Sequence, residues 1–422
     1  MIQTKLVLKL FEAFSIERWN DLVRPFDMIE MDKSGERMVL AYIIGKYEEE
    51  RGNEIDWHWL MYASLFGLLK KIALCDIKAP VQRMIKSEYP EEYKKLDEWV
   101  ISQYQDFIED KELFKQFSDY LLGNYKPKTE ITLRVYRAAH KYSTMREFEM
   151  ISVVNEKSRL TKIEKEINED IQPYLDLKGL QLLITKQKPY DFLMIIEQLR
   201  FQTRWNQTPR VPKTSVLGHC FFVAIFTLLL GREQSVKFCP KREYNNYFSA
   251  LFHDLPESVT RDIISPVKQA TRELPAIVKK LEDEIVQREL VPLMEKFYVD
   301  EILYFTSDEF DNRICDKNYQ NVREVSFEEL NEEAKAKAID DWRCGEHVYA
   351  WVDEIQNSAD AIAKAMSIKI SFDGNCYQTF CSWETNGFFS DEEWDMTGAR
   401  RIAWIEKRIP LKVLSYDIRQ KF

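Results

Sequence analysis

The chain has 422 residues, of which 45% are hydrophobic and 13% are aromatic. It is too long for one ordinary hydrophobic core, so we expect two or three domains, and its 12 Gly and 14 Pro are too few for disorder or for a sheet-rich fold. The net charge of −10 and the lack of a Lys/Arg block disfavour a long nucleic acid as partner, although a single pocket can still be positive enough for a small anionic ligand.

Three sequence features bear on the compartment. The N-terminus lacks the layout of a signal peptide, and the longest apolar run, residues 220–231, is shorter than the roughly 20 residues that span a bilayer. The seven cysteines form no CxxC pair, which favours free thiols in a reducing compartment. We therefore predict a cytoplasmic protein with no membrane partner.

Helical periodicity dominates the chain from its N-terminus onwards. Apolar residues recur at i, i+3, i+4 and i+7 in four stretches, namely residues 35–50, 93–108, 276–297 and 352–368. Strand alternation is rare, and its clearest example, residues 367–381, predicts a small β-hairpin around Asp373-Gly374-Asn375. The fold class that we predict is all-α.

A charged helix at residues 155–170 has few apolar anchors and divides the chain near residue 160. From this break we predict four segments. They are a helical domain at 1–155, a linker helix at 156–180, a second helical domain at 181–370 with an insertion at about 306–350, and a C-terminal extension at 371–422.

The two predicted domains share sequence with each other. Residues 61–81 align without a gap on residues 247–267, and IERWN at 16–20 corresponds to QTRWN at 202–206. We therefore predict two tandem copies of one helical unit. We align Gly35-Glu36 with Gly218-His219. Five polar residues of the second copy are then replaced by residues of another type in the first: His219, His253, Asp254, Glu257 and Asp360 are matched by Glu36, Gly67, Leu68, Lys71 and His140.

The polar residues of the second copy predict a metal site. His253 and Asp254 are adjacent before Pro256, where a helix end can turn both side chains into one cavity. His219 opens an apolar helix, and Asp360 has apolar neighbours. A buried imidazole or carboxylate without a partner costs about 1 to 3 kcal/mol or more, so these four residues favour a shared divalent ion. The alternative is a polar pair at a helix end that hydrogen-bonds to ordinary neighbours.

The ordered pattern H…HDxxE…D, with RW before it and RDxxxPVK around the following turn, resembles the HD superfamily of metal-dependent phosphohydrolases, and more closely the HD-type 5′-deoxynucleotidases. The resemblance covers about 198–366 and, more faintly, 14–150, so the chain would be two tandem HD-like units of which the first is degenerate. It implies an all-helical fold that binds one divalent ion (Mn, Co, Mg, Ni or Zn) through His219, His253, Asp254 and Asp360.

The resemblance further implies the hydrolysis of a phosphate ester of a small nucleotide, such as a nucleoside or deoxynucleoside phosphate. Glu257 would orient the attacking water or move a proton, Arg204 would hold the phosphate, and Trp205 and Asp262 would border the sugar. Two alternatives stay open. One is a phosphodiesterase of the same superfamily that acts on a cyclic or oligomeric nucleotide, and the other is a nucleotide-binding regulator with little turnover.

Arg18, Trp19 and Asp76 of the first copy correspond to the three predicted substrate-binding residues of the second, in a copy that lacks the metal ligands. These residues are therefore either structural or kept to hold a nucleotide that is not hydrolysed. Because related single-unit enzymes are dimeric, we also expect the two copies to pack as an intramolecular pseudo-dimer.

Overall fold

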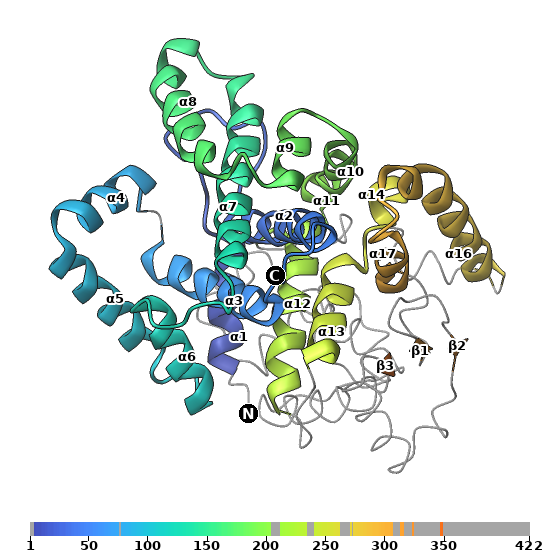
Figure 1. Ribbon diagram of the computed structural model, residues 1–422, viewed down its shortest axis with the longest axis horizontal. Coiled ribbons are helices and arrows are strands. Elements are labelled where there is room, and N and C mark those ends of the chain that lie inside the picture. Colours follow the sequence, from blue (N-terminus) through green and yellow to red (C-terminus); the bar gives the residue numbers. More distant parts are fainter. Residues whose placement is uncertain are drawn as a thin grey trace, which may run out of the picture. The chain divides into compact units, whose positions relative to one another are not determined.

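The computed structural model shows an all-α protein, which confirms the predicted fold class (Figure 1). It describes residues 4–75, 77–203, 212–233, 240–261, 271 and 273–306, and the backbone of three short strands between residues 313 and 348. The chain divides into two compact units, Met1–Gln181 and Leu182–Phe422. None of the described helices is long and apolar enough to cross a membrane. Cys75 and Cys220 carry free thiols.

The regular elements of the first unit are helices. They are α1 (Thr4–Phe11), η1 (Glu12–Phe14), α2 (Glu30–Glu50), α3 (Trp57–Leu74), α4 (Ala79–Glu88), α5 (Pro90–Tyr104), α6 (Lys111–Leu121), α7 (Glu130–Ser152), α8 (Lys157–Ile171), η2 (Gln172–Tyr174) and the first part of α9 (Lys178–Ile184).

Helix α2 lies at the centre of the first unit. Nearly all of its residues are buried, and it packs against α7 and α3. Its apolar side chains, such as Met38 and Ile43, are completely removed from solvent and supply hydrophobic stabilisation. The same helix also buries Lys33 and Arg37, and charges in such a place need partners inside the protein.

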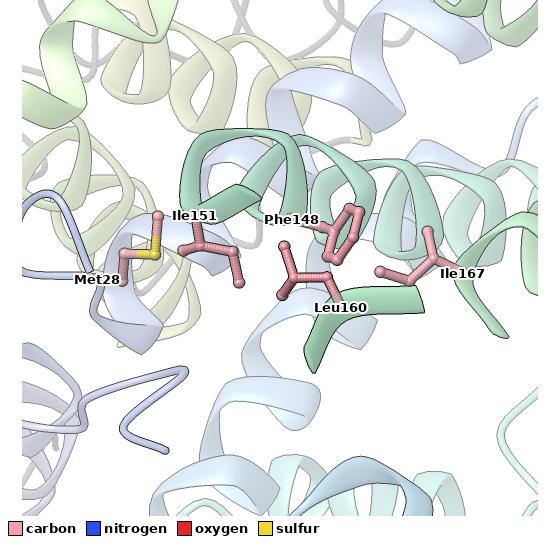
Figure 2. Packing of buried hydrophobic residues seen from close by; sticks show 5 residues of the cluster. All are labelled: Met28, Phe148, Ile151, Leu160 and Ile167. Atoms are coloured by element: carbon pink, nitrogen blue, oxygen red, sulfur yellow. The ribbon is translucent and has the colours of Figure 1, made fainter. Parts of the chain in front are cut away.

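The segment 156–180, which was predicted as a linker helix, contains α8, η2 and the start of α9, and α8 packs within the first unit. Leu160 and Ile167 of α8 belong to one buried cluster with Phe148 and Ile151 of α7 and with Met28 (Figure 2). Full burial of a side chain of this kind contributes about 1.5 to 3 kcal/mol. The few apolar residues of this charged helix are therefore enough to hold it against α7.

The second unit contains the remaining helices and the strands. They are α10 (Lys188–Ile196), α11 (Gln198–Phe201), α12 (Val216–Glu233), α13 (Pro240–Phe252), α14 (Glu257–Thr260), α16 (Leu274–Ile285), the π-helical turn η3 (Val286–Leu290), the 3₁₀ turn η4 (Val291–Leu293), α17 (Val299–Thr306), β1 (Arg313–Cys315), β2 (Arg323–Glu324) and β3 (His347–Val348).

Helices α12 and α13 lie side by side and form the main packed pair of the second unit (Figure 1). Helix α12 is apolar on every side, as expected for a helix that is buried all round. Aromatic rings join α13 to α17: Phe252 stacks on Phe305 with ring centroids 6.3 Å apart, and the hydroxyl of Tyr244 donates to Oε2 of Glu301 at 3.0 Å. This packing fixes the helix ends that carry the predicted polar residues.

Two parts of the second unit differ from the predicted elements. The stretch 276–297, predicted as one helix, is α16 followed by a π-helical and a 3₁₀ turn, because Pro292 has no N–H with which to continue the α-helical bonding. The predicted insertion contains three short antiparallel strands in the order β2-β1-β3. The hairpin predicted at 367–381 and the extension 371–422 lie outside the described residues.

Candidate metal centre

His219 is positioned by the start of α12. The N–H of Gly218 donates to Oγ of Ser215 at 2.9 Å, and the N–H of His219 donates to the carbonyl of Ser215 at 3.0 Å. Ser215 therefore caps the helix, and a serine before an apolar run is a typical signal for such a cap. The cap fixes the first turn of α12, in which the side chain of His219 is completely buried.

His253 and Asp254 lie where α13 ends. The helix stops at Phe252, and four residues in turns lead into α14. Pro256 cannot donate to the carbonyl four residues before it, so the α-helix cannot continue. Instead, the N–H of Glu257 donates to the carbonyl of Asp254 at 3.0 Å. These tight turns let two adjacent side chains point to the same side, which a regular helix would not allow.

The side chains of His219, His253 and Asp254 converge on one place in the second unit. Each offers one ligand atom, and these atoms lie within 4.8 Å of one another. Oδ2 of Asp254 lies 3.3 Å from Nε2 of His253 and 3.8 Å from Nε2 of His219, and the two imidazole ring centroids are 5.5 Å apart. Both histidines are buried, while the Asp254 side chain is 13% exposed. The carboxylate is therefore the most accessible of the three groups.

The chemistry of this donor set fits a divalent ion. Nδ1 of His253 lies 2.8 Å from the carbonyl oxygen of Ala250. In the neutral ring Nδ1–H donates to that carbonyl, so Nε2 keeps a lone pair on the side of Asp254. Two ligand atoms that are each about 2.1 Å from one ion lie roughly 3.0 to 3.4 Å apart at tetrahedral or octahedral angles. The 3.3 Å separation suits a shared ion, and a small side-chain rotation would bring His219 into the same range.

Glu257 follows the candidate ligands as the first residue of α14. It is half-buried, and its Oε2 atom is removed from solvent. Gln202 fixes this segment relative to α12. The side-chain NH₂ of Gln202 donates to the backbone carbonyl of Glu257 at 2.9 Å, and the backbone carbonyl of Gln202 accepts the N–H of Val216 at 3.0 Å. One residue therefore connects the helix that carries His219 with the helix that carries Glu257.

Sequence reasoning missed three residues of this region. Ser215 could have been found from its place before an apolar run, and Gln202 from its place in the segment QTRWN. Cys220 carried no such signal. Its thiol is buried and lies 3.9 Å from Oδ2 of Asp254, where it can act as a weak hydrogen-bond donor to the carboxylate.

The other predicted site residues are not placed by the structure. Asp360, predicted as the fourth metal ligand, lies outside the described residues, and so do Arg204, Trp205 and Asp262, which were predicted to bind substrate. Their roles stay predictions. The described part of the site therefore consists of three candidate ligands and one neighbouring carboxylate.

Two buried imidazoles and a carboxylate, gathered where one packed helix begins and the other ends, give the second unit the donor set that a helical metal-binding domain would need. The comparison with known families agrees with this class. Residues 196–344 match the family model of the HD domain, and the matched stretch includes His219, His253, Asp254 and Glu257 but ends before Asp360.

We therefore assign this stretch of the chain to the HD superfamily, whose domains are in general metal-dependent hydrolases that bind divalent ions. No curated protein and no solved structure matches the chain.

Proposed function

We propose that the second unit is a divalent-metal phosphohydrolase that hydrolyses a phosphate ester of a small nucleotide, with a nucleoside or deoxynucleoside phosphate as substrate. The observation that carries this proposal is the convergence of two imidazoles and one carboxylate within 4.8 Å, inside a stretch that matches the HD domain. The nucleotide as substrate rests on the motif RW…GH…HDxxE and its resemblance to the HD-type 5′-deoxynucleotidases.

The residues around the site have separate roles in this proposal. A bound divalent ion supplies positive charge against the phosphoryl oxygens and lowers the pKa of water. His219, His253 and Asp254 hold the ion, with His253 oriented by its hydrogen bond to Ala250. Glu257, three residues after Asp254, orients the attacking water and accepts its proton. Arg204 binds the phosphate, with Trp205 and Asp262 at the sugar and Asp360 as a fourth ligand.

The net charge of −10 fits a small substrate better than a long one. A long nucleic acid binds through many phosphate contacts at once, whereas one phosphate group needs only one local cluster of donors. A phosphomonoester and a short or cyclic diester both fit this charge. The substrates in the test must therefore include both kinds of ester.

The proposal is tested by measuring phosphate release from nucleoside mono-, di- and triphosphates with Mn, Co, Mg, Ni or Zn, and nitrophenol release from bis(p-nitrophenyl) phosphate for diesters. Wild type is compared with Asp254→Asn, which keeps the shape of the side chain and removes its charge. The matched control is Asp191→Asn, because Asp191 is exposed in the first turn of α10 of the same unit.

We expect Asp254→Asn to lower turnover about 100-fold or more and to lower the bound metal measured by mass spectrometry, since a lost ligand weakens both binding and the charge at the reacting phosphate. Asp191→Asn should behave like wild type. Equal phosphate release by wild type and Asp254→Asn would contradict the proposal, because the activity would then come from a contaminant.

A further inference from the structure

Features of the first unit recur in the second at a constant spacing of 186 residues. An isolated β-bridge joins Glu17 to Ile29 immediately before α2, and another joins Thr203 to Ser215 immediately before α12. In each unit the helix begins at the residue after the bridge. The two bridges and the two helix starts therefore set one register between the units, independently of any choice of matching letters.

The same spacing holds at the other end of the compared segments. Helix α3 ends at Leu74 and is followed by Cys75 with φ 50°, and α14 ends at Thr260 and is followed by Arg261 with φ 66°. A positive φ is uncommon for residues other than glycine. The principal difference between the units lies before these helix ends. In the first unit α3 is one continuous helix, whereas the second unit has α13, then the turn that carries His253 and Asp254, and then α14.

This register corrects one equivalence drawn from the sequence. Glu36 was laid on His219, but the bridges and helix starts place Lys33 at the position of His219. Three of the other four pairs fit this register, Gly67 with His253, Leu68 with Asp254 and Lys71 with Glu257, whereas His140 and Asp360 are 220 residues apart and do not. Two lysines of the first unit therefore stand where the second unit has a candidate metal ligand and the neighbouring carboxylate.

The space next to Gly67 is taken by a guanidinium. A Cβ atom built on Gly67 would lie 3.4 Å from Nη1 of Arg37 and 2.9 Å from the hydroxyl of Tyr136. A side chain at position 67 would therefore clash with the Tyr136 hydroxyl and would have to extend past Arg37. Arg37 comes from α2, one turn after Lys33, and its guanidinium lies beside position 67, which matches His253 in this register.

The carboxylates in this region are engaged by other groups. Arg18 donates to Glu147 at 3.0 Å and to Glu30 at 2.8 Å, and the indole of Trp19 donates to Glu147 at 2.8 Å. Lys33 donates to the hydroxyl of Thr144 at 2.7 Å and lies 3.9 Å from Oε2 of Glu147. These bonds fit a structural role for Arg18 and Trp19 in the first unit.

Neither Arg37 nor Lys71 forms an ion pair or a hydrogen bond with a carboxylate in the described part of the chain. Arg37 is only 6% exposed, and in the described part of the chain its guanidinium makes one long hydrogen bond, 3.5 Å to the carbonyl of Ser64, and stacks on the ring of Tyr136. Its Nε atom is buried without a hydrogen-bond partner. Lys71 is half-buried, forms no ion pair with a described residue, and interacts most strongly, among charged groups, with Glu30.

We propose that Arg37 and Lys71 of the first unit form a metal-free binding site for the phosphate group of a small anionic ligand. A planar guanidinium can donate two parallel hydrogen bonds to a phosphate, and an ammonium adds a compact positive charge with three donors. Such a ligand would supply the ion-pair partner that both side chains lack, since Glu30, whose field acts on both, is hydrogen-bonded to Arg18. Lys71 is the more exposed of the two and marks the side from which the ligand enters.

The site would bind its ligand without cleaving it. The positions that match His253 and Asp254 hold Gly67 and Leu68, neither of which can bind a metal ion. The first unit would therefore sense a phosphate compound while the second unit turns one over. This inference does not depend on the activity proposed for the second unit, because its test contains no catalytic step.

Calorimetric titration of the full chain tests the site directly. The protein carries Asp254→Asn and is kept in EDTA, so that metal-dependent binding in the second unit does not contribute. The probes are inorganic phosphate and AMP, each at the ionic strength of a sodium chloride blank. Tighter binding of AMP would identify a nucleotide as the ligand, and equal binding would identify the phosphate group itself. Either result supports the site.

Lys71→Gln is the decisive variant, and Lys70→Gln is its matched control. Lys70 is the preceding residue of the same helix but pairs with Asp97. We expect Lys71→Gln and Arg37→Gln to weaken binding tenfold or more, and Lys70→Gln to change it less than twofold. Because Arg37 is buried and its variant can fail to fold, Lys71→Gln alone decides. No measurable binding of either probe at millimolar concentration, or equal affinity in Lys70→Gln and Lys71→Gln, would overturn the proposal.

Discussion

Lys33 shows how burial changes the chemistry of a single residue. Its side chain is 1% exposed, and burial lowers the pKa of the ammonium from 10.5 to about 7. Burial also holds the pKa of His140 well below its usual value, so this neighbour is neutral. The charged groups whose fields act on Lys33 are Arg18, which lowers the pKa further, and Glu147, Glu36 and Glu30, which raise it.

This pKa predicts how stability depends on pH. Between about pH 7 and 10.5 the unfolded chain holds a proton on Lys33 that the folded chain has released, so stability rises as pH rises through this window. From pH 7 to pH 9 the gain is about 2 kcal/mol. We expect urea unfolding of wild type to show this gain and that of Lys33→Met to lack most of it.

Wild type must be compared with Lys33→Met because burial also lowers the pKa of Lys71. Lys71 therefore also makes stability rise with pH. The difference in slope between wild type and Lys33→Met isolates Lys33. If both proteins gained the same stability between pH 7 and pH 9, Lys33 would not be the group that titrates there.

At the scale of elements, the cap of α12 couples helix stability to the candidate metal centre. Ser215→Ala removes the acceptor of the Gly218 N–H and should lower the free energy of unfolding by about 1 kcal/mol. Because His219 lies in the same turn, metal affinity should fall as well. Calorimetric metal titration and urea unfolding measure the two effects. Ser87→Ala, at an exposed position of α4 in the first unit, should change neither.

The contact between α7 and α8 is a second test at this scale. Leu160 is 4% exposed and packs on Phe148 and Ile151, so Leu160→Ala should lower the free energy of unfolding by about 2 to 5 kcal/mol. Val153, at the end of α7, is 84% exposed, and Val153→Ala should cost less than about 0.5 kcal/mol. Equal losses in urea unfolding would show that α8 is not held by this face.

At the scale of the whole molecule, the two units should respond differently to a metal ion. A ligand that binds only the folded state stabilises it by about 2.7 kcal/mol at a concentration 100 times its Kd. Hydrogen exchange with Mn should therefore slow in α12, α13 and α14 and stay unchanged in α2 and α3. Asp254→Asn should show no slowing in either unit. Slowing in α2 and α3 of wild type would place a metal in the first unit and contradict the assignment.

Much of the candidate site could be predicted from sequence, because the types of its residues and their order along the chain are visible there. His219, His253 and Asp254 were chosen as polar residues in apolar helices, and the structure brings them together. The equivalence of Lys33 and His219 was missed, because the local match of Gly35 with Gly218 has a different register from the two longer matched stretches, which are 186 residues apart. The backbone bridges before α2 and α12 support the register of 186 residues. The pseudo-dimer of the two units stays a prediction.

The sequence by itself determined that the protein is helical and which residues can bind a cation, because helical periodicity and side-chain chemistry are local properties of the chain. Tertiary structure decided which of these residues meet. The turn before Pro256 brings Asp254 close to two imidazoles, while packing of α2 against α3 sets Arg37 against Gly67. Both outcomes depend on distances between residues that are far apart in sequence, and such distances are fixed only when the helices pack.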